Sequence, residues 1–152
     1  MGIYKIPLGE IECLQEGNDI TAISYGSTLR ILSEAAKTLQ QYNISIEVID
    51  IQTLIPFDLE ENIVLSIAKT NRLLIVDEDV PGGASSYILQ QLLEKQKVFK
   101  YLDSPPKLLS AKAHRPAYGS DGDYFSKPSH EDIFEAAYAM MHESDPQTYP
   151  AF

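Results

Sequence analysis

The sequence predicts an α/β fold: a doubly wound, mostly parallel, Rossmann-like sheet with helices on both faces. Two near-continuous apolar runs, at 20–25 and 72–77, are typical of strands that are covered on both faces. Each run is followed by apolar residues spaced three and four apart, which indicates a helix. Repeated strand–helix units require a parallel sheet, and right-handed crossovers place the helices on both of its faces.

The first unit combines a strand, a glycine turn and a helix. The run at 20–25 ends at Gly26, and the helical pattern extends over 28–42. Gly26 is predicted to turn the strand sharply into the helix, because glycine adopts backbone conformations that other residues avoid. Ser27 or Thr28 is predicted to cap the free N–H groups of the first helical turn.

The second unit follows Asn43, which we expect to end the first helix in the left-handed conformation. Alternating β-branched residues over 44–50 predict the second strand. Pro56 disfavours helix at the residue before it, so a turn follows this strand. Asp58 is expected to cap a second helix that runs to about Thr70.

The third unit starts with the strand at 72–77, the most apolar of the three. Gly82 and Gly83 are expected to open the third helix. Proline and glycine punctuate the chain beyond it, so we predict only a short fourth strand at 108–111 and an irregular loop over 115–128.

A capping pair predicts the last helix. Ser129 is followed three residues later by Asp132, and the helix is expected to run through about His142. Two prolines interrupt the tail at 144–152, which is therefore predicted to be non-helical. The chain is therefore predicted to have three parts: an arm or linker at 1–18, one domain at 19–143 and the tail. The arm is expected to contain a short edge strand at 11–14.

Composition and charge exclude several classes of protein. The 152 residues include 22 acidic and 12 basic side chains, a formal net charge of −10, which repels nucleic acid. This charge either serves only solubility or steers a basic protein partner. No apolar run is long enough to span a membrane, and the start lacks the pattern of a signal peptide. The single cysteine, Cys13, excludes an internal disulfide and a cysteine-based zinc cluster. These features predict a cytoplasmic protein.

The glycine turns do not form a nucleotide site. A dinucleotide fingerprint needs three glycines, but Gly26 stands alone, and no phosphate-binding loop motif follows. The turn at Gly82 and Gly83 is preceded by three carboxylates, which repel phosphate; these are Asp77, Glu78 and Asp79. Such a cluster suits a cation, a solvated loop or the docking of a basic group.

No self-contained active site is visible. The three histidines lie far apart in the sequence and lack the helical spacing of metal ligands; they are His114, His130 and His142. There is no nucleophile elbow, and no histidine lies near Cys13. The prediction from these residues is therefore a domain without catalytic, cofactor-binding or metal-binding residues of its own.

The order of the segments resembles one family. The stretches "YKIPLGE", "EGNDITAISYGSTLR", "IEVIDIQTLIPFD", "AKTNRLLIVDEDVPGGASSYI", "FKYLDSPPKLLSA" and "YFSKPSHEDIFEAA" are similar, in order and spacing, to the C-terminal domain of the beta subunit of thiamine-dependent 2-oxo acid dehydrogenases. The resemblance covers about residues 4–142. It implies a transketolase C-terminal-like domain at 19–143 that belongs to a larger enzyme, one that decarboxylates pyruvate or branched-chain 2-oxo acids oxidatively.

The resemblance also implies partners and cofactors. Thiamine diphosphate and magnesium are held by the alpha subunit and by the other half of beta, whose motifs have no match in this chain. The domain is expected to pair beta subunits and to dock the basic subunit-binding domain of the dihydrolipoyl acyltransferase. We hypothesise that Asp77, Glu78 and Asp79, or the loop with Asp121 and Asp123, supply carboxylates for that docking.

Two alternatives stay open at this point. Transketolase and deoxyxylulose phosphate synthase carry the same type of domain, although their local patterns match this sequence less well. A free-standing Rossmann-like module could instead bind a small ligand through Gly26 or through Gly82 and Gly83.

Overall fold

The computed structural model describes residues 5–115, 118–119 and 122–151, without the side chain of residue 123. Within these residues, five strands form one sheet with the order β1-β3-β2-β4-β5. The strands are β1 (Glu12–Gln15), β2 (Ile20–Ser24), β3 (Ile46–Asp50), β4 (Leu73–Val76) and β5 (Lys107–Leu109). β1 pairs antiparallel with β3, and every other pair is parallel. The predicted edge strand therefore exists, shifted by one residue.

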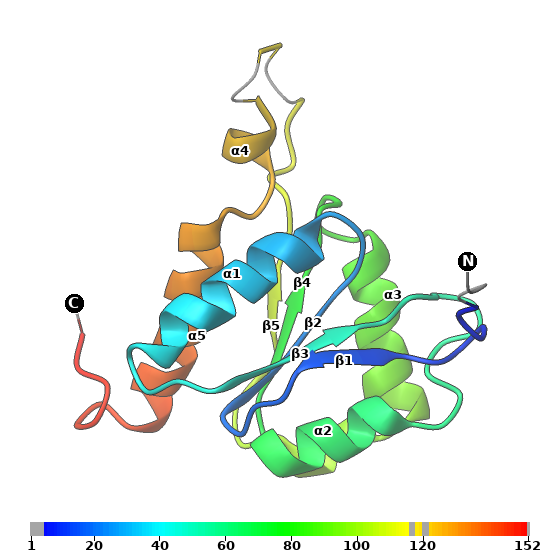
Figure 1. Cartoon of the computed structure of the whole chain (residues 1–152), viewed down its shortest axis with the longest axis horizontal. Coiled ribbons are helices and arrows are strands. Elements are labelled where there is room, and N and C mark those ends of the chain that lie inside the picture. The colour runs from blue at the N-terminus through cyan, green and yellow to red at the C-terminus, as the bar shows by residue number, and fades with distance from the viewer. Residues whose placement is uncertain (1–4, 116–117, 120–121, 152) are drawn as a thin grey trace.

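Helices cover both faces of this sheet, as Figure 1 shows. They are α1 (Thr28–Gln40), α2 (Asn62–Thr70), α3 (Ala84–Gln90), α4 (Gly122–Ser126) and α5 (His130–Ser144), with a π-helical turn η1 (Gln91–Lys95) and a 3₁₀ turn η2 (Val98–Tyr101). α1 and α5 lie against one face, and α2 and α3 lie against the other. The predicted fold class is confirmed.

Each face of the sheet has its own hydrophobic core. Successive side chains of a strand point to opposite faces, so Ala22 joins the core under α1 and α5, whereas its neighbour Ile23 joins the core under α2 and α3. Both are fully buried, as are Leu74 and Ile75 on β4. Burial on both faces explains why these strands appear in the sequence as continuous apolar runs.

Local signals placed most of the element boundaries correctly. Asn43 has a φ of 60° and follows α1, as predicted. The Asp58 carboxylate accepts hydrogen bonds from the backbone N–H groups of Asn62 (2.9 Å) and Ile63 (3.0 Å), so Asp58 caps α2 from four residues away. The tail after α5 is not helical within the described residues; Tyr149 donates to the carbonyl of Asn43.

The segment at 115–128 corrects one prediction. It is not irregular throughout, because the short helix α4 lies within it, and Figure 1 shows α4 projecting from the sheet. The backbone N–H of Lys112 donates to the carbonyl of Ser126 (2.8 Å) and ties the two ends of the projection together. A helix of five residues is too short to produce a detectable apolar period.

The capping box of α5 provides a stability test. The Ser129 hydroxyl accepts from the Asp132 backbone N–H (3.1 Å), and the Asp132 carboxylate accepts from the Ser129 backbone N–H (2.8 Å). We expect Ser129→Ala to lower the free energy of unfolding by about 1 kcal/mol, measured by urea denaturation. Ser86→Ala is the matched control, because Ser86 is an exposed serine within α3 and is not the cap residue of that helix. Equal losses in the two variants would contradict this assignment.

Candidate functional site at the carboxyl edge of the sheet

The centre of the sheet contains a topological switch point. The chain leaves β2 toward β3 through α1, on one face, and leaves β4 toward β5 through α3, on the other. In doubly wound sheets, ligands bind in the crevice outside the carboxyl ends of the two strands at such a point. The loops that follow β2 and β4 contain the turn and acidic residues singled out by the sequence, namely Gly26, Ser27, Asp77, Glu78, Asp79, Gly82 and Gly83.

Asp77 links the two loops at the switch point through hydrogen bonds. Its carboxylate is fully buried and accepts hydrogen bonds from the Tyr25 hydroxyl (2.5 Å) and from the backbone N–H groups of Ser85 (2.7 Å) and Asp79 (3.0 Å). Burial by itself raises the pKa of Asp77, but the donated hydrogen bonds outweigh it and hold this pKa below its ordinary value. Asp77 therefore joins the two loops and presents no carboxylate to a ligand.

Tyr25 is the side-chain partner of Asp77 at the switch point. Burial and the hydrogen bond to Asp77 raise the pKa of the Tyr25 phenol well above its ordinary value. The phenol therefore stays protonated and donates to Asp77 throughout the physiological pH range. This pair links the loop after β2 to the loop after β4 at the switch point.

The prediction that Ser27 or Thr28 caps α1 is wrong. Ser27 has helical backbone angles (φ −68°, ψ −28°) instead of the extended ones a cap residue needs, and its hydroxyl donates to the Glu78 carboxylate at 2.7 Å. The Thr28 hydroxyl is buried and has no hydrogen-bond partner. Gly26 has a φ of 61°, a left-handed backbone conformation that glycine adopts readily.

The remaining acidic side chains line an open pocket of about 350 Å³. Tyr25, Glu78, Asp79 and Lys127 surround it. Glu78 is partly exposed, with Lys127 Nζ 3.4 Å from its carboxylate, whereas Asp79 is exposed. A Cβ on Gly83 would lie 2.2 Å from the Asp79 carboxylate, so glycine at this position lets Asp79 fold back over the loop.

These residues do not fit a diphosphate or its metal. Carboxylates at the pocket repel phosphate, and the part of the chain that the structure describes contains no group of three His, Cys, Asp or Glu side chains able to hold a metal ion. The same part contains no helix with the length and apolar composition of a membrane span. Asp121 lies outside the described residues, as does the side chain of Asp123.

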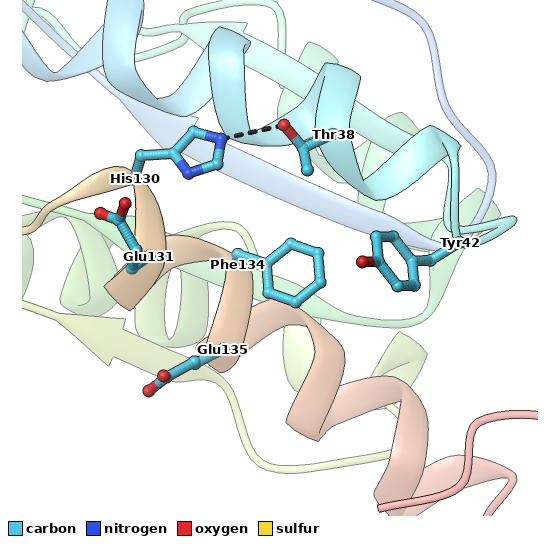
Figure 2. Close-up of a pocket in the computed structure, with 6 residues that line it drawn as sticks. All are labelled: Thr38, Tyr42, His130, Glu131, Phe134 and Glu135. Carbon is cyan, nitrogen blue, oxygen red and sulfur yellow. Dashed lines mark hydrogen bonds between the residues drawn. The ribbon is translucent and has the colours of Figure 1, made fainter. Parts of the chain in front are cut away.

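A second surface, between α1 and α5, was not found from the sequence. Thr38 and His130 are hydrogen-bonded across it, with 2.9 Å between Oγ1 and Nε2, and the rings of Tyr42 and Phe134 pack with their centres 5.1 Å apart. Figure 2 shows the two rings beside each other, with the Glu131 carboxylate pointing away from them; these side chains line a groove of about 440 Å³. Aromatic residues repeated along α5 were the only sequence signal for this groove.

The fold and this edge define a doubly wound α/β domain in which the buried carboxylate at the switch point, Asp77, is hydrogen-bonded within the domain itself. The sequence model of the family "Transketolase, C-terminal domain" matches residues 9–126. The chain belongs to this family. The match begins before β1 and includes it.

The relatives are beta subunits, as the resemblance predicted. The chain is 32% identical over 142 residues to the pyruvate dehydrogenase E1 component subunit beta of Rickettsia conorii, covering 93% of this chain and 43% of the relative. It is 41% identical over 103 residues to the mitochondrial 2-oxoisovalerate dehydrogenase subunit beta 2 of Arabidopsis thaliana, covering 67% of this chain and 28% of the relative. The chain thus spans less than half the length of these relatives.

A solved structure supports the fold alone. It is described as a split-gene transketolase in an inactive beta4 tetramer. It superimposes with a TM-score of 0.69 at 22% sequence identity, over 90% of this chain and 43% of that one.

Proposed function

We propose that this chain is the non-catalytic C-terminal domain of a 2-oxo acid dehydrogenase decarboxylating component, and that it serves subunit assembly and docks the dihydrolipoyl acyltransferase. The similarity to E1 beta subunits over 93% of the chain supports this proposal. The observation that carries it is the switch point, where the buried Asp77 carboxylate is hydrogen-bonded to Tyr25 and is not available to a ligand. Such a domain contributes surface rather than chemistry.

The whole enzyme would decarboxylate pyruvate or a branched-chain 2-oxo acid oxidatively, with thiamine diphosphate and magnesium held outside this domain. Those cofactors would be bound by the alpha subunit and the other half of beta. The domain would contribute to the contact between two beta subunits. A free-standing ligand-binding module draws little support from the two glycine turns. Gly83 lies against the Asp79 carboxylate, and the groove at Gly26 is lined by the Asp50 side chain, so both places repel an anionic ligand.

Docking is assigned to the exposed carboxylates at the carboxyl edge. The partner is the basic subunit-binding domain of the acyltransferase, and the net charge of −10 steers it toward this chain. Glu78 and Asp79 are the accessible members of the acidic cluster, while Asp77 holds their loop in place. Lys127 already occupies part of this surface as an internal cation.

Charge neutralisation tests the docking surface. We expect Glu78→Gln combined with Asp79→Asn to weaken binding of the acyltransferase's subunit-binding domain by about tenfold and to flatten its salt dependence, measured by calorimetry at two salt concentrations. The matched control is Glu60→Gln with Glu61→Gln, an adjacent pair of exposed carboxylates at the start of α2. Unchanged affinity and salt dependence in the first variant would refute this surface.

A further inference from the structure

An exposed apolar patch lies on the arm and on the loop between β3 and α2. Four side chains form what we call the arm patch, with exposed fractions of 47% for Ile6, 70% for Leu8, 82% for Ile55 and 66% for Leu59. Single exposed apolar residues are ordinary on protein surfaces, but several gathered at one place mark an interaction site.

Backbone contacts hold the two halves of the arm patch together. The N–H of Gly9 donates to the Thr53 hydroxyl (2.8 Å), and the N–H of Leu59 donates to the Gly9 carbonyl (2.9 Å). A Cβ on Gly9 would lie 2.7 Å from the Leu59 side chain and 3.0 Å from Pro56, so the segments are in van der Waals contact. Figure 1 shows the described part of the arm, which leads into β1, beside the loop between β3 and α2. The patch is therefore preformed rather than a loose end.

A groove continues the arm patch onto the sheet. It has a volume of about 370 Å³ and lies between the arm, at Ile6 and Leu8, and the ends of β2 and β3, at Gly26 and Asp50. Apolar side chains of a partner could seat on the patch while one of them enters this groove. A preformed surface of this kind loses little conformational entropy on binding.

The relatives indicate what covers the patch. The family is named for a C-terminal domain, and this chain spans only 43% of the Rickettsia conorii subunit. The family's name indicates that other regions of such a subunit precede the domain, and they would be joined to it through the arm, which contains Ile6 and Leu8. Two regions joined by a short connection meet at a high effective concentration, so an apolar surface at the connection point is the one most readily buried.

We propose that the arm patch packs against the region that precedes this domain in an E1-beta-type subunit. The proposal rests on the proposed function, because it requires such a region in the native protein. Ile55 is the anchor: it is the most exposed of the four, so the domain's own fold gains little from it and burial against the preceding region gains most.

Thermal unfolding of two forms of the protein tests this. Ile55→Asp is made in the 152-residue chain and in the native protein expressed from its complete gene, whose amino-terminal region is identified by mass spectrometry. We expect the melting temperature to change by less than about 1 °C in the 152-residue chain and to fall by about 5 °C or more in the native protein. Leu8→Ser should show the same difference between the two forms, with a smaller fall.

Phe99→Asp is the matched control. Phe99 is 74% exposed in η2, and η2 bonds to the far end of α2 through Asn71. Phe99→Asp should change the melting temperature of both forms equally. If the native protein has an E1-beta-type amino-terminal region and Ile55→Asp shifts both forms equally, the arm patch proposal is wrong and the proposed function stands. If the native protein has no such region, both proposals are wrong.

Discussion

Gly17→Ala is expected to lower the free energy of unfolding by about 3 kcal/mol or more. A Cβ at Gly17 would lie 2.2 Å from the backbone nitrogen of Glu47 and from the carbonyl carbon of Ile46. Both atoms belong to β3, which is paired with β1 on one side and β2 on the other. The strand cannot move aside without breaking these ladders, so the loop between β1 and β2 must detach instead.

Urea denaturation of Gly17→Ala, followed by circular dichroism, measures this loss. The control is Gly26→Ala, which isolates backbone strain from steric contact. Gly26 has a φ of 61° but nothing within 4 Å of an added Cβ, so only strain of about 1–2 kcal/mol is expected. A Gly17 variant as stable as the Gly26 variant would show that the loop does not lie against β3 as described.

Asp77→Ala is expected to cost about 3–5 kcal/mol, because it leaves three donors without an acceptor in a buried position. These donors are the Tyr25 hydroxyl and the backbone N–H groups of Asp79 and Ser85. The same denaturation experiment with Asp79→Ala is the control. Asp79 is exposed, and its carboxylate accepts only from the N–H of Val80 in the described contacts, so a loss below about 1 kcal/mol is expected.

The pH dependence of stability measures the contribution of the Asp77 charge, because asparagine at this position has nearly the same shape but no charge. Its pKa is lowered in the folded state, so its contribution to stability is present above the ordinary value of 3.8 and is lost as the pH falls toward the lower folded value. The stability difference between the wild type and Asp77→Asn should therefore shrink between about pH 6 and about pH 3. A difference that stays constant or grows on acidification would contradict the lowered pKa.

The resemblance to E1 beta subunits and the architecture were both available before the structure. Strand positions followed from apolar runs, and the cap of α5 followed from Ser129 and Asp132, because these signals are encoded within a few residues of each other. The first-turn cap of α1 failed for the opposite reason. Ser27 has the right chemistry, but Glu78, fifty-one residues away in the sequence, takes its hydroxyl.

By itself, the sequence determined the α/β alternation, the absence of a nucleotide fingerprint and the family, since each depends on local patterns or on their order along the chain. Only the tertiary structure decided which carboxylate of the acidic cluster is buried and which is exposed. The sheet order places β2 beside β4, although β3 lies between them in the sequence, and this brings Tyr25 to Asp77. Local sequence patterns do not specify which strands become neighbours in the sheet. The pairing of β2 with β4 buries the Asp77 carboxylate and leaves Asp79 exposed.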